Sequence, residues 1–341
     1  MRIGLVGYGA GGRWFHAPYI DAAEGVELVG VVTRSPQRIA ELHAERPGMP
    51  TYGRITELLA AGVDAVAITT PPQTRRELVL EAIAAGVHIV ADKPFATSAE
   101  SAAELGAAAD AAGVRLSVFH QRRADADIVT LTQVLDAGEL GPVWRFHSSF
   151  DLDEPGSLDA GPHGGLLRDL GSHLVDQALW LFGPAVRVSA EVDWVDLPAG
   201  RTDGGFVVTV EHATGPVSFL SASKLNRLVQ RSLAVYAEGG SYVATGSDVQ
   251  TGAIKAGRRP KDDPGGWGYE PEQHWGRLTT AMGTRVVPSA QGNHATYYSA
   301  FAAAVATGGP VPVPVSDAVD VLRVLDAART SALEHRVVGL D

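Results

Sequence analysis

The sequence predicts an α/β protein with two domains, an N-terminal doubly wound parallel sheet and a C-terminal α+β domain with a large, mostly antiparallel sheet. Short apolar runs alternate with helical stretches over residues 1–120. After residue 121 the pattern changes to longer runs in which apolar and polar residues alternate. A length of 341 residues also fits two domains of roughly 150 residues each. We therefore expect domains at 1–120 and 121–341.

The first domain is expected to alternate strand and helix. Apolar runs predict strands at residues 2–6, 27–32, 65–69, 87–91 and 115–119. Helix signals lie between them: Ser35 followed by Pro36, a helix at 75–85 that ends at Gly86, and the capping-box spacing of Thr97 and Glu100 before an Ala-rich helix that ends at Gly113. Strands that are apolar throughout and separated by helices imply a parallel sheet covered on both faces.

The second domain is expected to mix helices with an antiparallel sheet. Helices are predicted at 126–136 and 167–182, and a strand at 143–150. The segments VRVSAEVDWV, GFVVTVEH and SFLSASK have the period-two pattern of strands with one solvated face. Residues 257–273 are rich in Gly, Pro and charge and predict a long loop. Two closing helices, near 295–307 and 317–332, are expected to pack back on the first domain.

Composition excludes several classes of function. There is no Cys, which excludes disulfide scaffolds and thiol catalysis and suits a cytoplasmic protein. A net charge of −11 argues against a nucleic-acid partner. No apolar run approaches the roughly 20 residues that span a bilayer, so we expect no membrane partner. The apolar N-terminus is interrupted by glycines and is interpreted as a strand, not as a signal peptide.

The turn after the first strand has the G-x-G-x-x-G pattern of a dinucleotide-binding Rossmann domain. Its residues are Gly7, Tyr8, Gly9, Ala10, Gly11 and Gly12. The first glycine allows a tight turn, the second lets the backbone approach a pyrophosphate, and the third permits close helix packing. The pattern also occurs in ordinary Gly-rich turns, but its place between a strand and a helix favours cofactor binding.

The end of the second strand favours NADP(H) over NAD(H). An acid normally stands there to bind the ribose 2′-hydroxyl of NAD, but this chain has Thr33 and Arg34. A guanidinium and a hydroxyl are suited to a 2′-phosphate. A solvated Arg at a strand end is the alternative, so NAD(H) remains open.

Polar and rigid residues follow two further strands. Thr69 and Thr70 precede Pro71 and Pro72 after one strand, and Asp92-Lys93-Pro94 follows another. Ligands collect at these carboxyl ends in open α/β sheets, and a Lys there suits a substrate hydroxyl. An equal alternative is that these residues only shape the loops and bind no ligand.

The stretch 164–176 is the densest in potential catalytic groups. Asp169 and His173 are four residues apart and share a helix face, and Asp176 lies three residues beyond His173. A carboxylate beside an imidazole orients it as a general base for a secondary alcohol. A polar, wet helix face is the alternative. No third strong ligand type lies nearby, so no metal is expected.

The exit from the first domain carries polar and cationic residues: His120, Gln121, Arg122, Arg123 and, close behind, Asp125. They could contact a nicotinamide carboxamide, a phosphate or a polyol. A solvated interdomain hinge is the alternative interpretation.

These segments, in this order, resemble the glucose-fructose oxidoreductase, inositol dehydrogenase and MocA family over nearly the whole chain. Its E-K-P motif appears as Asp92-Lys93-Pro94, and its D-x-x-x-H motif as residues 169–173. VFHQRRADAD, DLGSHLVDQALWLFG and AGRRPKDD resemble the branch of NADP-dependent scyllo-inositol 2-dehydrogenases. Asp92 replaces the usual Glu, Gln121 a usual Asn, and Arg75 a common His.

The resemblance implies a catalytic trio of Lys93, Asp169 and His173. It implies a cofactor site that includes Thr70, Pro71, Pro72, Asp92, Lys93 and Gln121 as well as the glycine-rich turn, Thr33 and Arg34. The substrate would be a cyclic polyol or sugar. Candidate substrate-binding residues are His120, Arg122, Arg123, Asp125, His163 and Asp176.

The resemblance also implies a homodimer or homotetramer formed through the C-terminal sheet. Three alternatives to a polyol dehydrogenase remain at this stage: a dehydrogenase of the same family that acts on an aldose or diol, a family glycosidase that retains its NAD, and a cofactor-binding sensor without catalysis.

Overall fold

The computed structural model describes residues 1–161, 163–246 and 248–340. The chain forms two compact units, each built from three segments. The first unit comprises Met1–Gln121, Gln250–Trp267 and Asn293–Val319, and the second comprises Arg122–Val249, Gly268–Gly292 and Asp320–Asp341. Residues 250–267, which sequence alone placed with the second domain, lie in the first unit.

The first unit contains the predicted parallel sheet. Its strands lie in the order β3-β2-β1-β4-β5-β6, and every neighbouring pair is parallel. The strands are β1 (Arg2–Val6), β2 (Glu27–Val32), β3 (Thr51–Tyr52), β4 (Ala65–Ile68), β5 (His88–Asp92) and β6 (Leu116–Phe119). The side chains of β4 and β6 are fully buried, as expected for a sheet covered on both faces. This order is that of a Rossmann fold, which confirms the predicted fold class.

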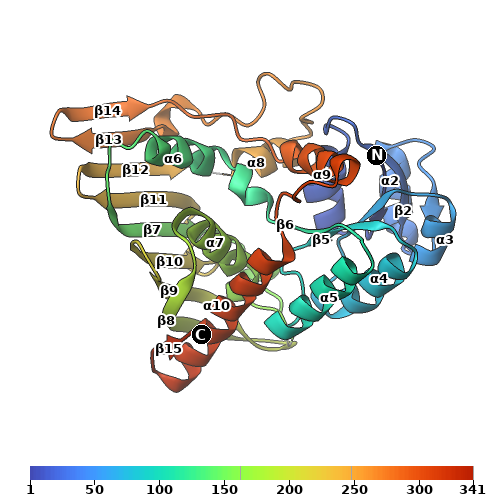
Figure 1. Ribbon diagram of the computed structural model, residues 1–341, viewed down its shortest axis with the longest axis horizontal. Coiled ribbons are helices and arrows are strands. Elements are labelled where there is room, and N and C mark those ends of the chain that lie inside the picture. The colour runs from blue at the N-terminus through green and yellow to red at the C-terminus, as the bar shows by residue number, and fades with distance from the viewer. Residues whose placement is uncertain (162, 247, 341) are drawn as a thin grey trace. The chain divides into compact units, whose positions relative to one another are not determined.

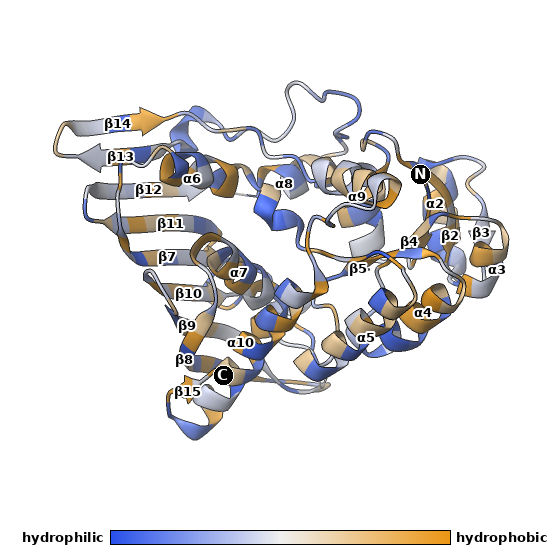
Figure 2. Cartoon of the chain, viewed as in Figure 1, coloured by the Kyte–Doolittle hydropathy of each residue, from blue (hydrophilic) through white to orange (hydrophobic). Residues whose placement is uncertain are grey.

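The helices of the first unit follow the predicted alternation. They are a π-helical segment (Gly11–His16), α1 (Ala17–Ile20), α2 (Pro36–Glu45), α3 (Ile55–Ala60), α4 (Pro72–Ala84), α5 (Ala99–Ala111), α9 (Ala295–Thr307) and all but the first residue of α8 (Val249–Lys255). Ser35 caps α2, as predicted, by accepting a hydrogen bond from the Arg38 N–H. The predicted cap of α5 was wrong by one residue, because Ser98 and not Thr97 accepts from the Ser101 N–H. Figure 2 shows hydrophobic and hydrophilic residues mixed along α4 and α5.

The edge strand β6 is completed by residues from much later in the chain. The Val118 N–H donates to the Val313 carbonyl at 3.1 Å. The buried Ser117 hydroxyl donates to the same carbonyl at 2.9 Å and accepts from the Tyr297 hydroxyl of α9 at 2.6 Å. The first unit therefore depends on α9 for its core.

The second unit contains a nine-stranded sheet in the order β14-β13-β12-β11-β7-β10-β9-β8-β15 (Figure 1). Neighbouring strands are antiparallel except for β7 and β10, which pair in parallel. The strands are β7 (Val143–Asp151), β8 (Ala185–Leu197), β9 (Gly200–His212), β10 (Val217–Ser223), β11 (Gln230–Ala237), β12 (Gly240–Gly246), β13 (Gly276–Thr280), β14 (Gly283–Val287) and β15 (Val338–Gly339).

Helices of the second unit cover one face of this sheet. They are α6 (Ala126–Asp136), α7 (Leu166–Phe182) and the greater part of α10 (Val315–Glu334), with short 3₁₀ turns at Gln121–Ala124, Pro155–Ser157 and Glu272–His274. Along β9 the side chains of Phe206, Val208 and Val210 are buried while those between them are more exposed. The period-two pattern therefore places one face of the strand against α7.

In the described part of the chain, no helix combines the length and apolar character needed to cross a membrane.

Candidate active site

The glycine-rich turn of the first unit has the geometry that close approach of a phosphate requires. Gly7 has φ +103°, a left-handed conformation that favours glycine. A Cβ on Gly12 would collide with the carbonyl oxygen of Gly7, so only glycine fits where the helix begins. The Tyr8 side chain instead turns into the core and donates to Glu45 at 2.8 Å, which leaves only its backbone for a ligand.

Two buried polar atoms at the predicted cofactor site fit a dinucleotide. Among the described residues, Thr70 Oγ1 and Gln121 Oε1 are buried and make no hydrogen bond. Thr70 follows β4 and Gln121 follows β6, so both stand at carboxyl ends of the parallel strands. Buried polar atoms normally have partners, and their lack of one is consistent with a ligand that supplies it.

Arg38 is a candidate cofactor residue that sequence analysis missed. Its guanidinium lies over the glycine-rich turn, with Nη1 3.5 Å and Cζ 3.6 Å from the position of a Cβ on Gly9. Arg38 and Arg34 are both exposed, and both lie just beyond β2. The spacing of Arg38 three residues after the cap Ser35 was the available signal, because it places Arg38 in the first turn of α2.

Asp92 stands at the end of β5 and faces the same turn. Its Oδ2 lies 3.3 Å from the position of a Cβ on Gly11, and its Oδ1 accepts from the Lys93 backbone N–H at 2.9 Å. Burial, the largest influence, would raise the pKa of Asp92, but His16, Arg75 and Lys93 together lower it to about 2. Asp92 is therefore ionised at neutral pH.

Arg75 organises the loops after β4 and β5. It is buried, donates from Nε to the Thr70 carbonyl at 2.6 Å, and donates from Nη1 to the carbonyls of Asp92 and Pro94. Burial lowers the pKa of Arg75 to about 10, which leaves it charged at neutral pH. A buried cation thus links the two loops that flank the half-buried Lys93.

In the second unit, α7 carries both Asp169 and His173. The two are one helical turn apart, and His173 is buried while the Asp169 side chain is 47% exposed. Lys224, which sequence analysis missed, follows β10 and donates to Asp169 Oδ2 at 3.1 Å although it is itself buried. A lone cation after a strand gives no sequence signal for this pairing.

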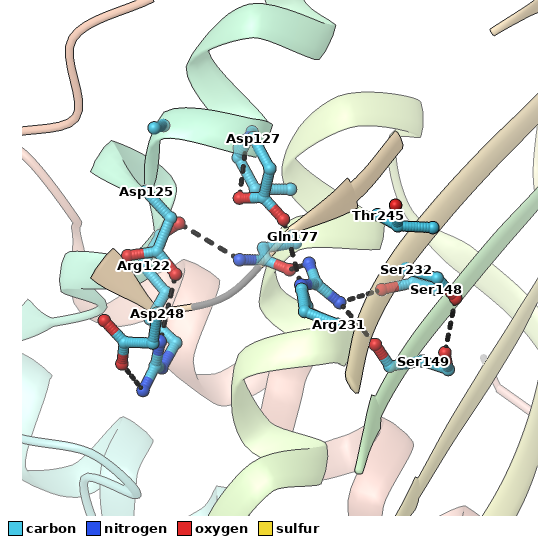
Figure 3. A network of polar contacts seen from close by, with 12 residues as sticks. Arg122, Asp125, Asp127, Ser148, Ser149, Gln177, Arg231, Ser232, Thr245 and Asp248 are labelled. Carbon is cyan, nitrogen blue, oxygen red and sulfur yellow. Dashed lines mark hydrogen bonds and ion pairs between the residues drawn. The ribbon is translucent and has the colours of Figure 1, made fainter. Parts of the chain in front are cut away.

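Several predicted substrate residues bind each other in the second unit. Arg123 donates to both carboxylate oxygens of Asp176, at 2.9 and 2.6 Å, and Asp176 is 2% exposed. Arg122 donates to Asp125 at 3.0 Å and to Asp248 at 2.7 Å (Figure 3). Their charges are therefore compensated inside the unit. Contact of the substrate with Arg122, Arg123, Asp125 and Asp176 stays a prediction. His120, by contrast, is buried in the first unit.

A second buried network anchors α7 just beyond His173. Arg231 of β11 donates to Asp127 at 3.0 Å, to Gln177 at 2.9 Å and to Ser148 at 2.6 Å (Figure 3). Gln177 also donates to the Arg122 carbonyl at 3.0 Å. The helix turn that follows His173 is therefore tied to α6 and to two strands.

The surroundings of His163 favour the neutral form of its imidazole. Burial and the nearby charges of Arg168 and Arg329 lower its pKa from the ordinary value of about 6.5. A neutral imidazole can both donate and accept a hydrogen bond, and a substrate hydroxyl can do the same. In the described ranges no three or more His, Cys, Asp or Glu residues are grouped to hold a metal ion.

Comparison with known proteins gives matches to two family models. Residues 1–120 match the model described as "Oxidoreductase family, NAD-binding Rossmann fold", and residues 128–243 match the "GFO/IDH/MocA C-terminal domain". The first match agrees with the glycine-rich turn described above.

Two curated relatives and one solved structure extend the likeness over the whole chain. The chain is 31% identical to the scyllo-inositol 2-dehydrogenase (NADP(+)) IolW of Bacillus subtilis, covering 100% of this chain and 96% of the relative. It is 35% identical to the uncharacterized oxidoreductase YdgJ of Escherichia coli, covering 98% and 97%. The oxidoreductase YvaA of Bacillus subtilis superposes with a TM-score of 0.90 at 31% identity, covering 100% and 98%.

Proposed function

This chain belongs to the GFO/IDH/MocA family of oxidoreductases, and from that premise we propose that it transfers a hydride between NADP(H) and a secondary hydroxyl or ketone of a cyclic polyol or sugar. The observation that carries the proposal, and its choice of NADP(H), is the set of charged residues around Gly9. The Arg38 guanidinium lies over this glycine, Arg34 stands nearby in sequence, and residues 33–38 contain no carboxylate. This charge pattern attracts a 2′-phosphate and offers no acid for a free ribose 2′-hydroxyl.

The proposed catalytic residues are Lys93 in the first unit and Asp169 and His173 in the second. A nicotinamide bound at the glycine-rich turn and the carboxyl ends of β4 to β6 would supply the hydride donor or acceptor. His173 takes the proton of the substrate hydroxyl, and Asp169 orients His173 for this task. Lys93 binds the same oxygen and stabilises the negative charge that develops on it. Lys224 holds the Asp169 carboxylate in place from β10.

The substrate class rests on the relationship to a scyllo-inositol 2-dehydrogenase and on the polar residues of both units. A scyllo-inositol-like ring is the first candidate, and an aldose or diol is the second. The proposed polyol-binding residues remain His120, Arg122, Arg123, Asp125, His163 and Asp176. The compensated charges of Arg123 and Asp176 make His120 and His163 the stronger candidates within this set.

The test is a panel of inositols, keto-inositols, aldoses and simple alcohols assayed by absorbance with NADP(H) and NAD(H) in parallel. We expect turnover of a polyol or sugar with NADP(H) and failure of deoxy analogues that lack the reacting hydroxyl. Equal activity on simple apolar alcohols would contradict the substrate class. A cofactor that copurifies tightly without net turnover would favour the glycosidase alternative instead.

Loss of catalytic groups provides the matched control for this assay. Lys93→Ala and His173→Ala should abolish turnover while leaving cofactor binding in place, and the double variant should be no worse than either single variant. Retention of most of kcat in either single variant would contradict the assigned roles.

A further inference from the structure

His16 is a fully buried histidine that has no part in the proposed hydride transfer. It ends the π-helical segment that follows the glycine-rich turn, and its ring packs on Phe119 with 4.1 Å between ring centroids. Its Nδ1 lies 2.5 Å from the Tyr298 hydroxyl, and its Nε2 lies 3.4 Å from Asp92 Oδ1. The ring thus joins α9 to the carboxylate at the end of β5.

The two contacts favour the tautomer of the neutral ring in which Nε2 carries the proton. Burial raises the pKa of Tyr298 well above its usual value, so its hydroxyl keeps its proton and can donate it to Nδ1. In that tautomer the remaining proton lies on Nε2, the nitrogen that is 3.4 Å from Oδ1 of the ionised Asp92. Arg75 and Lys93 are also charged and close to this carboxylate, and Arg75 Nη2 is 3.8 Å from Oδ2. Oδ1 thus accepts from the Lys93 backbone N–H and lies beside His16 Nε2, while Oδ2 lies between Arg75 and Gly11.

The place of Asp92 in the sheet indicates which part of a dinucleotide its Oδ2 would meet. In the order β3-β2-β1-β4-β5-β6, the half made of β1 to β3 receives the adenosine part of a dinucleotide and the half made of β4 to β6 receives the nicotinamide part. A carboxylate is repelled by phosphate but accepts hydrogen bonds from hydroxyls, which makes a ribose its natural partner.

We propose that His16 is a positioning residue that holds the Asp92 carboxylate in the orientation in which it binds the ribose of the nicotinamide half. The inference rests on the proposed dinucleotide binding. His16 does not touch the cofactor in this arrangement. It acts through Asp92, and Tyr298 keeps its ring in the required tautomer and orientation.

The test compares the affinities of a whole dinucleotide and of its adenosine half, measured by calorimetry. The dinucleotide is NADPH with 2′,5′-ADP as its fragment, or NADH with ADP if the wild type prefers NADH. His16→Asn places an amide near the Nδ1 position, where it can still meet Tyr298, but is too short to reach Asp92. We expect its Kd for the dinucleotide to rise about tenfold, the scale of one charge-assisted hydrogen bond, with no change for the fragment.

Four further variants, namely His16→Gln, His88→Asn, Asp92→Asn and the double variant of His16→Asn with Asp92→Asn, distinguish this role from a general structural one. His16→Gln, which reaches the Nε2 position, should recover part of the lost affinity. His88→Asn at the opposite end of β5, where Nδ1 accepts from the Arg115 N–H, should change neither Kd. In an Asp92→Asn background, His16→Asn should cause no further loss, because the two residues act as one unit.

Each outcome decides one point. Equal weakening of dinucleotide and fragment would show that His16 merely maintains the turn, and an unchanged dinucleotide Kd would show that it has no role; either result overturns the inference. A wild type that binds neither NADPH nor NADH would instead overturn the proposed function. Thermal unfolding of each variant confirms that the folded protein is being titrated.

Discussion

Lys224 is buried, yet its ammonium donates a hydrogen bond to the half-exposed carboxylate of Asp169 at 3.1 Å. Lys224 follows β10 and Asp169 lies in the first turn of α7, so this pair links the sheet to the helix that carries His173. We expect Lys224→Met to lower kcat by about tenfold or more, because Asp169 loses the group that fixes it. Steady-state kinetics should show this fall with an unchanged cofactor Kd.

Lys224→Arg is the control, because it keeps the charge and should retain more activity than Lys224→Met. An unaltered kcat in Lys224→Met would contradict the proposed role of Lys224.

Removal of the guanidinium groups beyond β2 should change cofactor preference. Arg34→Ala and Arg38→Ala should each raise the Kd for NADPH by roughly ten- to a hundred-fold, since each loses a charge-assisted contact with the 2′-phosphate. Binding of NADH, which lacks that phosphate, should change little. Fluorescence titration of both cofactors measures the effect, and Arg76→Ala on the exposed face of α4 is the control. An equal loss for NADPH and NADH would exclude recognition of the 2′-phosphate.

The second unit should lose stability in mild acid through His212. Burial lowers its pKa, with Nδ1 2.7 Å from the Gly183 carbonyl and Nε2 2.9 Å from the Ser218 hydroxyl. The unfolded chain therefore binds the proton more readily than the folded one, so the stability present above the unfolded pKa of about 6.5 is lost as pH falls toward the folded value. His212→Gln cannot titrate, and its Tm should fall less than that of the wild type between pH 7 and pH 5. Parallel slopes of Tm against pH would contradict this.

The buried Arg231 should matter far more to stability than an exposed Arg of the same sheet. Arg231→Met leaves the buried Asp127 without its cation and should cost about 3–5 kcal/mol of unfolding free energy. Arg187 and Glu211 form an ion pair with side chains 61% and 38% exposed, so Arg187→Met should cost no more than about 1 kcal/mol. Urea unfolding compares the two. Similar losses would mean that the Arg231 network is not the anchor described here.

The nine-stranded sheet should mediate association of subunits through its exposed face, which is the face opposite the helices of the second unit. Val207 of β9, Tyr236 of β11 and Val243 of β12 are 40% to 52% exposed there. We expect a homodimer or homotetramer, and Val207→Asp should raise its dissociation constant at least about tenfold by burying a charge at the contact. Light scattering measures the mass. Leu333→Asp on α10, at an apolar site that is 61% exposed, should leave the assembly intact. A monomeric wild type would contradict the prediction.

The regular parts of both units could be predicted from sequence because their burial follows a simple period. Continuous apolar runs become β1, β2, β4, β5 and β6, and the alternation along β9 places Phe206 and Val208 on the buried face. The cap of α5 shows the limit of this approach. Thr97 and Ser98 both have hydroxyls suited to an N-cap, and only the backbone path selects Ser98.

The elements and contacts that the sequence patterns did not predict depend on residues that are distant in sequence. In β11 the inward residue Arg231 interrupts the apolar alternation, and its burial makes sense only when Asp127 and Gln177 are known to meet it. Helix α8 is short and lies outside the predicted helices. His16 resembles any helical His until the Tyr298 hydroxyl, 282 residues later, is placed beside it.

The hydrogen bonds between β6 and residue 313 have a consequence for synthesis of the chain. Residues 1–121 contain all six strands of the parallel sheet. When the ribosome has released them, Val313 and Tyr297 have not yet been synthesised, so Ser117 lacks both of its hydrogen-bond partners. A nascent chain therefore holds an incomplete Rossmann unit while nearly 200 further residues emerge. A fragment cut at residue 121 would expose the side of β6 that α9 covers, whereas the same residues supplied together with a peptide of 293–319 would have the partners that complete the core.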